Sequence, residues 1–217
     1  MLSVKNLTKI YKIKGKDVKH VVALDRVSID FPETGMVFLL GKSGSGKSTL
    51  SNLLLEKYKD NCIYLEIDKV GHRALEKEEV REKVIAAFGN SVIKGGKVDR
   101  KRVSDIVFNN RKEMDKLTDI TWNYMQIEID KFLDENKDKI IILDWLLLPI
   151  TRYFDMCDIK IVLDIPYEVR KERVIKRDNI DIHAFDLREK ASIDLDINKF
   201  DIVVKNNDAI KKLVIKL

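Results

Sequence analysis

The chain carries, at residues 41–48, the sequence Gly41-Lys42-Ser43-Gly44-Ser45-Gly46-Lys47-Ser48, which fits the phosphate-loop pattern G-x-x-x-x-G-K-[ST]. The apolar run 36–40 precedes it and predicts a strand, and residues 49–55 continue with a helical pattern. In this context the backbone N–H groups of the loop can surround a phosphate, and the helix N-terminus favours negative charge. The pattern therefore predicts a nucleoside triphosphate site. The alternative is a glycine-rich turn with an accidental lysine.

The residue types in the loop each suit this chemistry. Glycines let successive N–H groups turn inward, Lys47 adds a positive charge that also serves transfer of the phosphoryl group, and Ser48 can hold Mg²⁺ while it opens the helix. We expect the nucleotide, ATP, to contact Gly41, Ser43, Gly44, Ser45, Gly46, Lys47, Ser48 and Thr49.

Composition limits the remaining possibilities. The chain has 217 residues and 45% hydrophobic content, enough for one large core, and a second full domain is not expected. The formal net charge is +5, but lysines alternate with acidic residues in the helical patterns, so nucleic-acid binding is not expected as the main role. The apolar run 140–150 contains Asp144 and is too short to span a bilayer.

The two cysteines, Cys62 and Cys157, form no C-x-x-C pair and lie beside strand-like segments. They are expected to be buried thiols in a reduced setting, and the amino terminus lacks an apolar signal core. These features favour a cytoplasmic protein.

Short β-rich runs alternate with helical patterns from Met36 onward, which is typical of an α/β fold with a parallel sheet. The expected strands cover residues 36–40, 62–67, 140–143, 159–163 and 201–204. The expected helices between the second and third strands form an insertion at about residues 72–137 and cover 76–88, 102–109, 111–117 and 121–136. Residues 2–4, 9–12 and 21–30 alternate apolar and polar side chains and predict an antiparallel β extension within residues 1–35, ahead of the main domain at 36–217.

The first 50 residues resemble the start of an ABC transporter ATPase, through residues 2–11, 22–29 and the phosphate loop with Thr49-Leu50. In that family the aromatic residue matching Tyr11 stacks on adenine. The resemblance ends there, because the sequence has no L-S-G-G-Q signature, no plausible switch histidine, and Trp145 instead of glutamate after Asp144.

From Ser51 onward the chain resembles dephospho-CoA kinases, which phosphorylate the ribose 3′-hydroxyl of dephospho-CoA. The matching pieces stand in the family's order: Glu66-Ile67-Asp68, Gly71-His72, Phe88-Gly89, Val98-Asp99-Arg100-Lys101-Arg102-Val103, Ile106-Val107-Phe108, Leu117-Thr118-Asp119-Ile120-Thr121, Ile142-Leu143-Asp144, Arg173-Val174-Ile175-Lys176-Arg177-Asp178 and Phe200-Asp201-Ile202-Val203-Val204-Lys205-Asn206. The resemblance implies a P-loop NTPase fold of the nucleoside-kinase kind, ATP with Mg²⁺, and a small-molecule acceptor. The chain departs from the family at Trp122-Asn123, at Trp145 and displaced Pro149, at Arg170 where glutamine is usual, and in the segment 188–200.

Two acidic residues are expected at the carboxyl edge of the sheet, where open α/β folds bind their ligands. Asp68 follows the second strand and can accept a hydrogen bond from the ribose hydroxyl as the catalytic base; the alternative is a helix cap. Asp144 ends the third strand and is expected to hold Mg²⁺ with Ser48; the alternative is an aspartate that opens a turn.

Basic residues that follow are candidates for the phosphates. Arg173 and Arg177 are four apart on one helix face and can converge on phosphates or adenine, and Arg188, in a lid at about residues 178–195, can add a cation at transfer. Surface charge is the alternative for Arg173 and Arg177.

Four further residues complete the expected site. Asp99, Arg100 and His72 are expected to bind the acceptor, while Asn206 resembles the family residue near adenine. Asp99 can also cap the helix that it starts. The alternatives are a local ion pair for Asp99 and Arg100, a surface histidine for His72 and a turn-forming asparagine for Asn206.

The sequence thus favours an ATP-dependent kinase acting on dephospho-CoA or a close nucleotide-like acceptor. Three alternatives stay open: an ABC-type ATPase, a non-catalytic nucleotide-binding module that docks a partner through its N-terminal strands, and a kinase for another acceptor, suggested by Trp122 and Trp145.

Overall fold

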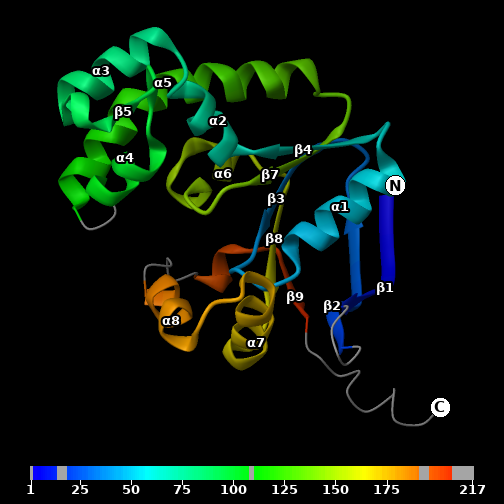
Figure 1. Cartoon of the computed structure of the whole chain (residues 1–217). Coiled ribbons are helices and arrows are strands. Elements are labelled where there is room, and N and C mark those ends of the chain that lie inside the picture. Colours follow the sequence, from blue (N-terminus) through cyan, green and yellow to red (C-terminus); the bar gives the residue numbers. More distant parts are fainter. Residues whose placement is uncertain (1, 14–18, 108–109, 191–195, 207–217) are drawn as a thin grey trace. The chain divides into compact units, whose positions relative to one another are not determined.

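The computed structural model describes residues 2–13, 19–107, 110–190 and 196–206 (Figure 1). The chain forms two compact units. The first, Met1–Leu65 with Lys137–Leu217, is called the sheet unit; the second, Glu66–Asn136, is called the helical unit and takes up the region where the sequence predicted a helical insertion. Each unit is described by itself.

A five-stranded sheet lies at the centre of the sheet unit, in the order β4-β7-β3-β8-β9. The strand β3 pairs in parallel with β7 and β8, and β9 pairs in parallel with β8. The strands are β3 (Gly35–Leu40), β4 (Cys62–Glu66), β7 (Ile140–Asp144), β8 (Ile159–Asp164) and β9 (Ile202–Lys205). The expected α/β class with a parallel sheet is therefore confirmed, although residue 67 begins a helix instead of ending β4.

The helices of the sheet unit connect these strands along the chain. They are α1 (Lys47–Tyr58), η2 (Leu148–Ile150), α6 (Arg152–Asp155), α7 (Tyr167–Asp178), α8 (Ile182–Lys190) and η3 (Ile197–Lys199). The lid predicted at about residues 178–195 falls on α8, while residues 191–195 lie outside the described residues.

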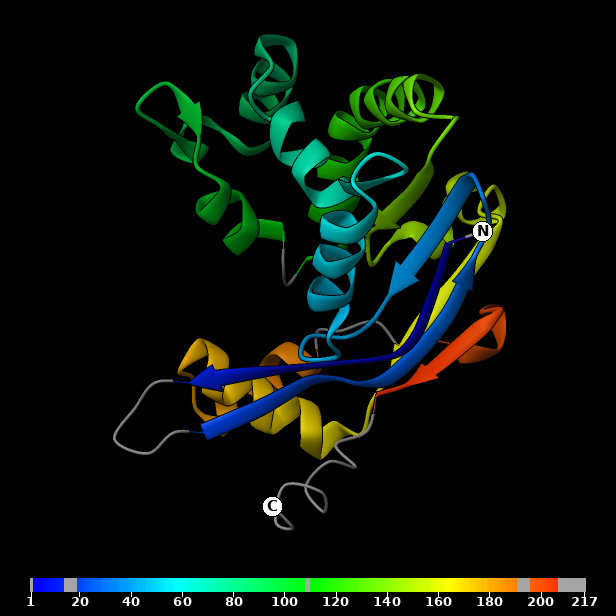
Figure 2. The ribbon, with the colours of Figure 1, turned by 90° about the vertical axis from the view of Figure 1, so that its right-hand side faces the viewer.

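The amino-terminal residues form an antiparallel hairpin of two long strands, β1 (Leu2–Ile13) and β2 (Lys19–Phe31). Figure 2 shows the hairpin in blue, with β9 in orange running beside β2. The sequence predicted two short strands, 2–4 and 9–12, where the structure has the single strand β1. This expectation was wrong because bulges at Val4/Leu7, Leu7/Lys9 and Lys9/Ile10 shift the register without ending the strand.

One hydrophobic core joins the hairpin to the sheet. Leu24, Val27, Ile29 and Phe31 of β2 are between 0% and 3% exposed and belong to the same cluster as Leu39 of β3 and helix α1. The hairpin therefore supplies part of the core of the sheet unit. Cys62 and Cys157 are buried free thiols, as expected, and burial raises the pKa of Cys62 to about 11 and that of Cys157 to about 12.

The helical unit consists of α2 (Ile67–Ala74), α3 (Glu78–Phe88), η1 (Asn90–Val92), α4 (Arg100–Val107) and α5 (Arg111–Glu135), with a short hairpin of β5 (Ile93–Lys94) and β6 (Lys97–Val98). A second hydrophobic cluster, including Val84, Val92 and Val103, holds it together. The sequence predicted separate helices at 111–117 and 121–136, and this was wrong. Helix α5 runs unbroken through Thr118 and Thr121, whose hydroxyls are accommodated by donating to the carbonyl oxygens of Met114 and Leu117 one turn back (3.0 and 2.9 Å).

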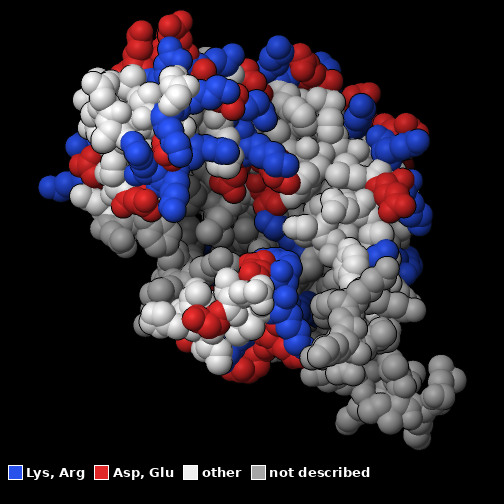
Figure 3. All heavy atoms as spheres, viewed as in Figure 1, with Lys and Arg blue, Asp and Glu red and all other residues white. Residues whose placement is uncertain are grey.

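Charges of both signs cover the surface that Figure 3 shows, with Lys and Arg side chains next to Asp and Glu. In the described part of the chain, no helix is both long enough and apolar enough to cross a lipid bilayer.

Candidate nucleotide-binding site

The phosphate loop connects the end of β3 at Leu40 to the first residue of α1, Lys47. Gly44 and Gly46 have φ angles of 84° and 96°, in the left-handed region that favours glycine. A Cβ atom on Gly44 would lie 3.0 Å from Val174 Cγ2, and one on Gly46 would clash with the carbonyl oxygen of Ala23. The loop is thus held closely by α7 on one side and by β2 on the other.

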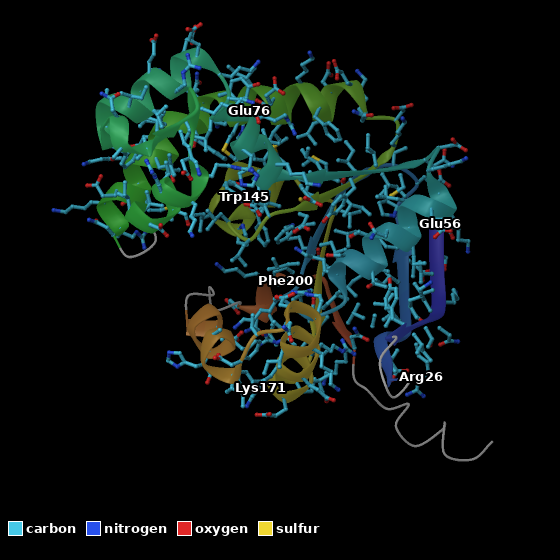
Figure 4. All side chains as sticks on the ribbon, viewed as in Figure 1. Arg26, Glu56, Glu76, Trp145, Lys171 and Phe200 are labelled. Carbon is cyan, nitrogen blue, oxygen red and sulfur yellow. The ribbon has the colours of Figure 1, made fainter. Side chains whose placement is uncertain are left out.

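Lys47 is positioned by an acidic partner from the neighbouring strand. Its Nζ donates to a carboxylate oxygen of Asp144, at the end of β7, and the hydroxyl of Tyr64 on β4 donates to the other oxygen. Because these three residues come from three neighbouring elements, the parallel sheet brings them together at its carboxyl edge. Trp145 follows Asp144 and is one of the positions at which the chain departs from the family (labelled in Figure 4). Its side chain is buried, at 7% exposed.

Helix α7 places three arginines against the phosphate loop. Arg173 donates from Nη1 to the Gly44 carbonyl oxygen (3.1 Å), and Arg177 donates from Nη2 to Ser43 Oγ (3.0 Å). Arg173 and Arg170 are 9% and 5% exposed, whereas Arg177 is exposed. The shared helix face predicted for Arg173 and Arg177 is present, and it meets the loop at the Gly44 backbone and at the Ser43 side chain.

Arg170 forms a bidentate ion pair with Glu189 of α8, at 3.0 and 2.7 Å from its two terminal nitrogens. Lys42 of the phosphate loop donates to the same carboxylate at 2.8 Å. The hydrogen bond from Arg170 lowers the pKa of Glu189 to about 2, with Lys42 contributing, against the opposing effect of burial. Glu189 therefore ties α8 to both α7 and the loop. Arg188 precedes it on α8, and the Arg188 side chain lies outside the described residues.

Asn206 follows β9 and is fully buried. Its side-chain NH₂ donates to the carbonyl oxygens of Ala23 and Ser45, both at 2.7 Å, and its Oδ1 accepts from the backbone N–H of Asp25 at 2.9 Å. All three of these bonds go to protein groups, two on β2 and one in the phosphate loop. The role of Asn206 near adenine stays a prediction.

Ser48 and Asp144, the two residues expected to hold a magnesium ion, offer the kind of oxygen atoms that this ion prefers. Mg²⁺ prefers carboxylate, hydroxyl and phosphate oxygens and keeps several waters, so it needs few protein ligands. Ser48 lies in the first turn of α1 with an exposed side chain, next to Lys47, which contacts Asp144. Their ligand role stays a prediction.

Asp68 and His72 both lie on helix α2 of the helical unit and are exposed, so the four-residue spacing does place them on one helix. Asp99 accepts hydrogen bonds from the backbone N–H groups of Lys101 and Arg102 (3.1 and 3.3 Å) and pairs with Arg102 at 3.6 Å. Asp99 therefore caps α4, as expected, and it also forms a local ion pair, which was the alternative interpretation. Arg100 is the exposed first residue of that helix. Acceptor binding by these residues stays a prediction.

Sequence reasoning missed Tyr64, Glu189 and the two backbone groups of β2 that meet Asn206. Tyr64 was visible only as one of the apolar positions of a predicted strand. Glu189 offered one signal: it follows Arg188 in the region where the chain departs from its family, and Arg170 is also a departure. Two charged residues in unusual places can indicate a pair, but only the fold brings them within 3 Å of each other.

A parallel α/β sheet with an ordered phosphate loop, a loop lysine held by a strand-end aspartate, and flanking arginines defines a P-loop nucleotide-binding protein. The dephospho-CoA kinase family profile matches residues 35–212, and a dephospho-CoA kinase of Fusobacterium nucleatum is 36% identical over 186 residues, covering 84% of this chain and 94% of its own length. The chain belongs to the dephospho-CoA kinase family. A relative in Aquifex aeolicus, also named dephospho-CoA kinase, is 32% identical over 179 residues, covering 80% and 89%.

Solved structures share the fold. The crystal structure of TT1252 from Thermus thermophilus has a TM-score of 0.70 at 22% identity and covers 84% of this chain and 94% of its own. A dephospho-CoA kinase from Campylobacter jejuni has a TM-score of 0.51 at 22% identity, with coverage of 83% and 92%. The resemblance to this family, the fold class and the kinase class predicted from the sequence are thereby confirmed. The family match begins at residue 35, so the ABC-like character of the first residues stays a prediction.

Proposed function

We propose that this chain transfers the γ-phosphoryl group of ATP to the ribose 3′-hydroxyl of dephospho-CoA and so forms coenzyme A. The observation that carries the proposal is the phosphate loop, with Lys47 held by Asp144, in a chain that matches the dephospho-CoA kinase profile over residues 35–212. An ABC-type or non-catalytic module is not favoured, because its support is confined to the first 50 residues.

The residues of the proposed site have two roles, positioning and charge neutralisation, and these are what phosphoryl transfer requires of a protein. The loop N–H groups and Lys47 hold the β- and γ-phosphates. Arg177 and Arg188 are assigned to the phosphoryl group during transfer, and Arg173 keeps the loop in place by its bond to Gly44. Asp68 accepts the proton of the attacking hydroxyl, and His72 and Arg100 bind the acceptor.

A magnesium ion bound with the nucleotide would neutralise charge on its phosphates. In this proposal Ser48 would hold the ion through its hydroxyl oxygen and Asp144 would hold it through water. Tyr64 donates to Asp144 and keeps its carboxylate oriented toward the loop. A cytoplasmic setting and a docking partner for the hairpin remain predictions, and Ile10 and Tyr11, 40% and 45% exposed, are the apolar residues that such a partner would meet.

ADP release by the purified chain, with ATP and Mg²⁺ and with or without dephospho-CoA, tests the function. We expect turnover that depends on the acceptor, and a 3′-phosphomonoester that ³¹P NMR detects in the product. Equal ADP release without acceptor would instead indicate an ATPase, and ATP binding without turnover would indicate a non-catalytic module. Turnover with adenosine diphosphate but not with dephospho-CoA would indicate a different acceptor.

A further inference from the structure

A completely buried carboxamide connects the amino-terminal hairpin to the phosphate loop. The Asn206 side chain has no exposed surface, and its three bonds reach residues 161 to 183 positions away in the sequence. Its own backbone N–H donates to the carbonyl oxygen of Asp164 at 3.0 Å, which fixes it at the end of β8. Such a buried group is retained only when its hydrogen bonds are satisfied.

The chemistry of the site selects an amide. Ala23 presents its carbonyl oxygen to Asn206, and Asp25 presents its backbone N–H group. Neither residue is among the paired positions of β1 and β2. One acceptor and one donor on a single carboxamide satisfy this edge of β2 as a neighbouring strand would. The second N–H of the same amide remains for Ser45. Aspartate has no donor when ionised, and leucine has neither group.

The bond to Ser45 fixes the orientation of a peptide group in the phosphate loop. In a trans peptide the C=O and the following N–H point in opposite directions, and the described residues contain no cis peptide. Because the Ser45 oxygen is held backward toward Asn206, the N–H of Gly46 must point to the other side of the loop. In this motif the loop N–H groups are the phosphate ligands.

We propose that Asn206 is a positioning residue for the phosphate loop, and that the hairpin is its support. Through Ser45 it sets the direction of the Gly46 N–H, and through Ala23 and Asp25 it is held by β2. The family match covers residues 35–212, and the hairpin of β1 and β2 precedes it. This chain therefore extends its nucleotide site with a segment outside the matched region. The inference rests on the nucleotide-binding part of the proposed function and does not depend on the acceptor.

The test is the binding of phosphate compounds to Asn206→Asp, an isosteric variant that loses both donors. We expect the dissociation constants of ADP and of inorganic tripolyphosphate to rise in parallel, each at least about tenfold. The KM for ATP should rise, while the KM for dephospho-CoA stays within about twofold. If only ADP weakens and tripolyphosphate does not, Asn206 acts on adenine and the proposal is wrong.

A matched control separates positioning from stability. Val27→Ala removes a buried side chain of the same hairpin, 1% exposed, and leaves the Asn206 bonds in place. It should lower the melting temperature without a change in tripolyphosphate affinity. If it weakens tripolyphosphate as much as Asn206→Asp does, the effect is general destabilisation and the inference fails.

Asn206→Ser is the replacement test if the Asn206→Asp variant does not fold. It keeps one hydroxyl donor in less volume, and we expect tripolyphosphate affinity between those of wild type and a loop variant, Lys47→Ala. Wild-type affinity in a folded Asn206→Ser chain would overturn the proposal. Binding is measured without acceptor, so failure here and failure of the kinase reaction are distinguishable.

Discussion

Lys47 and Asp144 show how a single pair can prepare a site for a charged substrate. The Lys47 side chain is 21% exposed and the Asp144 side chain 12%, so both are partly removed from water and each charge reduces the cost of burying the other. Tyr64 takes the second carboxylate oxygen and leaves it less free to rotate. Lys47 is therefore held in the loop before a nucleotide arrives.

Asp68→Asn should separate chemistry from nucleotide binding. The amide cannot take the proton of the ribose hydroxyl, so we expect kcat to fall by about 10²–10⁴. The KM for ATP should remain within about twofold, whereas Lys47→Ala should raise it at least about tenfold because it removes the charge that we propose to bind phosphate. Steady-state kinetics with varied ATP measures both.

Glu76→Gln is the matched control for this prediction. It neutralises another exposed carboxylate of the helical unit, and both kinetic constants should stay near wild type. An Asp68→Asn enzyme with unchanged kcat would refute the role of Asp68 as base.

Helix α8 is attached to the rest of the sheet unit by charge. Glu189 receives hydrogen bonds from the buried guanidinium of Arg170 and from Lys42, and Tyr167 donates to Asp186 at 2.6 Å. Phe185, 2% exposed, adds an apolar contact with the ring of Tyr167. The helix that carries Arg188 thus reaches the phosphate loop through the Glu189 carboxylate and packs on α7 through Phe185.

Glu189→Gln should lower the free energy of unfolding by about 1–3 kcal/mol at pH 7, since the folded pKa of about 2 lies well below the ordinary 4.5. A carboxylate whose pKa is lowered by folding stabilises the folded state at pH values above its unfolded pKa. The difference from wild type should therefore shrink as the pH falls from about 4.5 towards about 2. Urea unfolding at several pH values measures it.

Glu168→Gln on the neighbouring helix α7 is the control, because its side chain is 78% exposed and its pair with Lys171 is 3.7 Å long. Exposed pairs of this kind contribute about 0–1 kcal/mol. A Glu189→Gln difference that persisted unchanged at pH 2 would show that the carboxylate charge is not what stabilises the helix.

At the scale of the whole molecule, the hairpin is part of the core and more than an attachment. Leu24, Val27, Ile29 and Phe31 are nearly inaccessible, and each such side chain contributes about 1.5–3 kcal/mol on burial. Together this is comparable to the entire stability of a typical domain, about 5–15 kcal/mol. The sheet unit should not keep its structure without β1 and β2.

Deletion of residues 1–31 should therefore abolish the cooperative thermal unfolding that circular dichroism records. The double variant Ile10→Ser, Tyr11→Ser is the control: both side chains are exposed, so stability should change by less than about 1 kcal/mol. A truncated chain that unfolds at the wild-type temperature would show that the hairpin does not stabilise the core.

The sequence predicted those parts of the site that are local along the chain. The phosphate loop, its strand and its helix are contiguous, and apolar runs identified the buried strands. Two features escaped because they depend on distant contacts: Glu189 meets Lys42 across 147 positions, and Asn206 meets Ser45 across 161. The break predicted in α5 failed for another reason, since the threonine hydroxyls find acceptors within the helix and so do not require it to end.

The buried amide of Asn206 also has a consequence for how the protein is made. Synthesis proceeds from the amino terminus, so Ala23 and Asp25 leave the ribosome long before the residue that will satisfy their polar groups. Asn206 is synthesised 183 positions after Ala23 and 181 positions after Asp25, so its carboxamide reaches this edge of β2 only late. The edge of β2 and the phosphate loop are therefore completed by a residue that is made long after both.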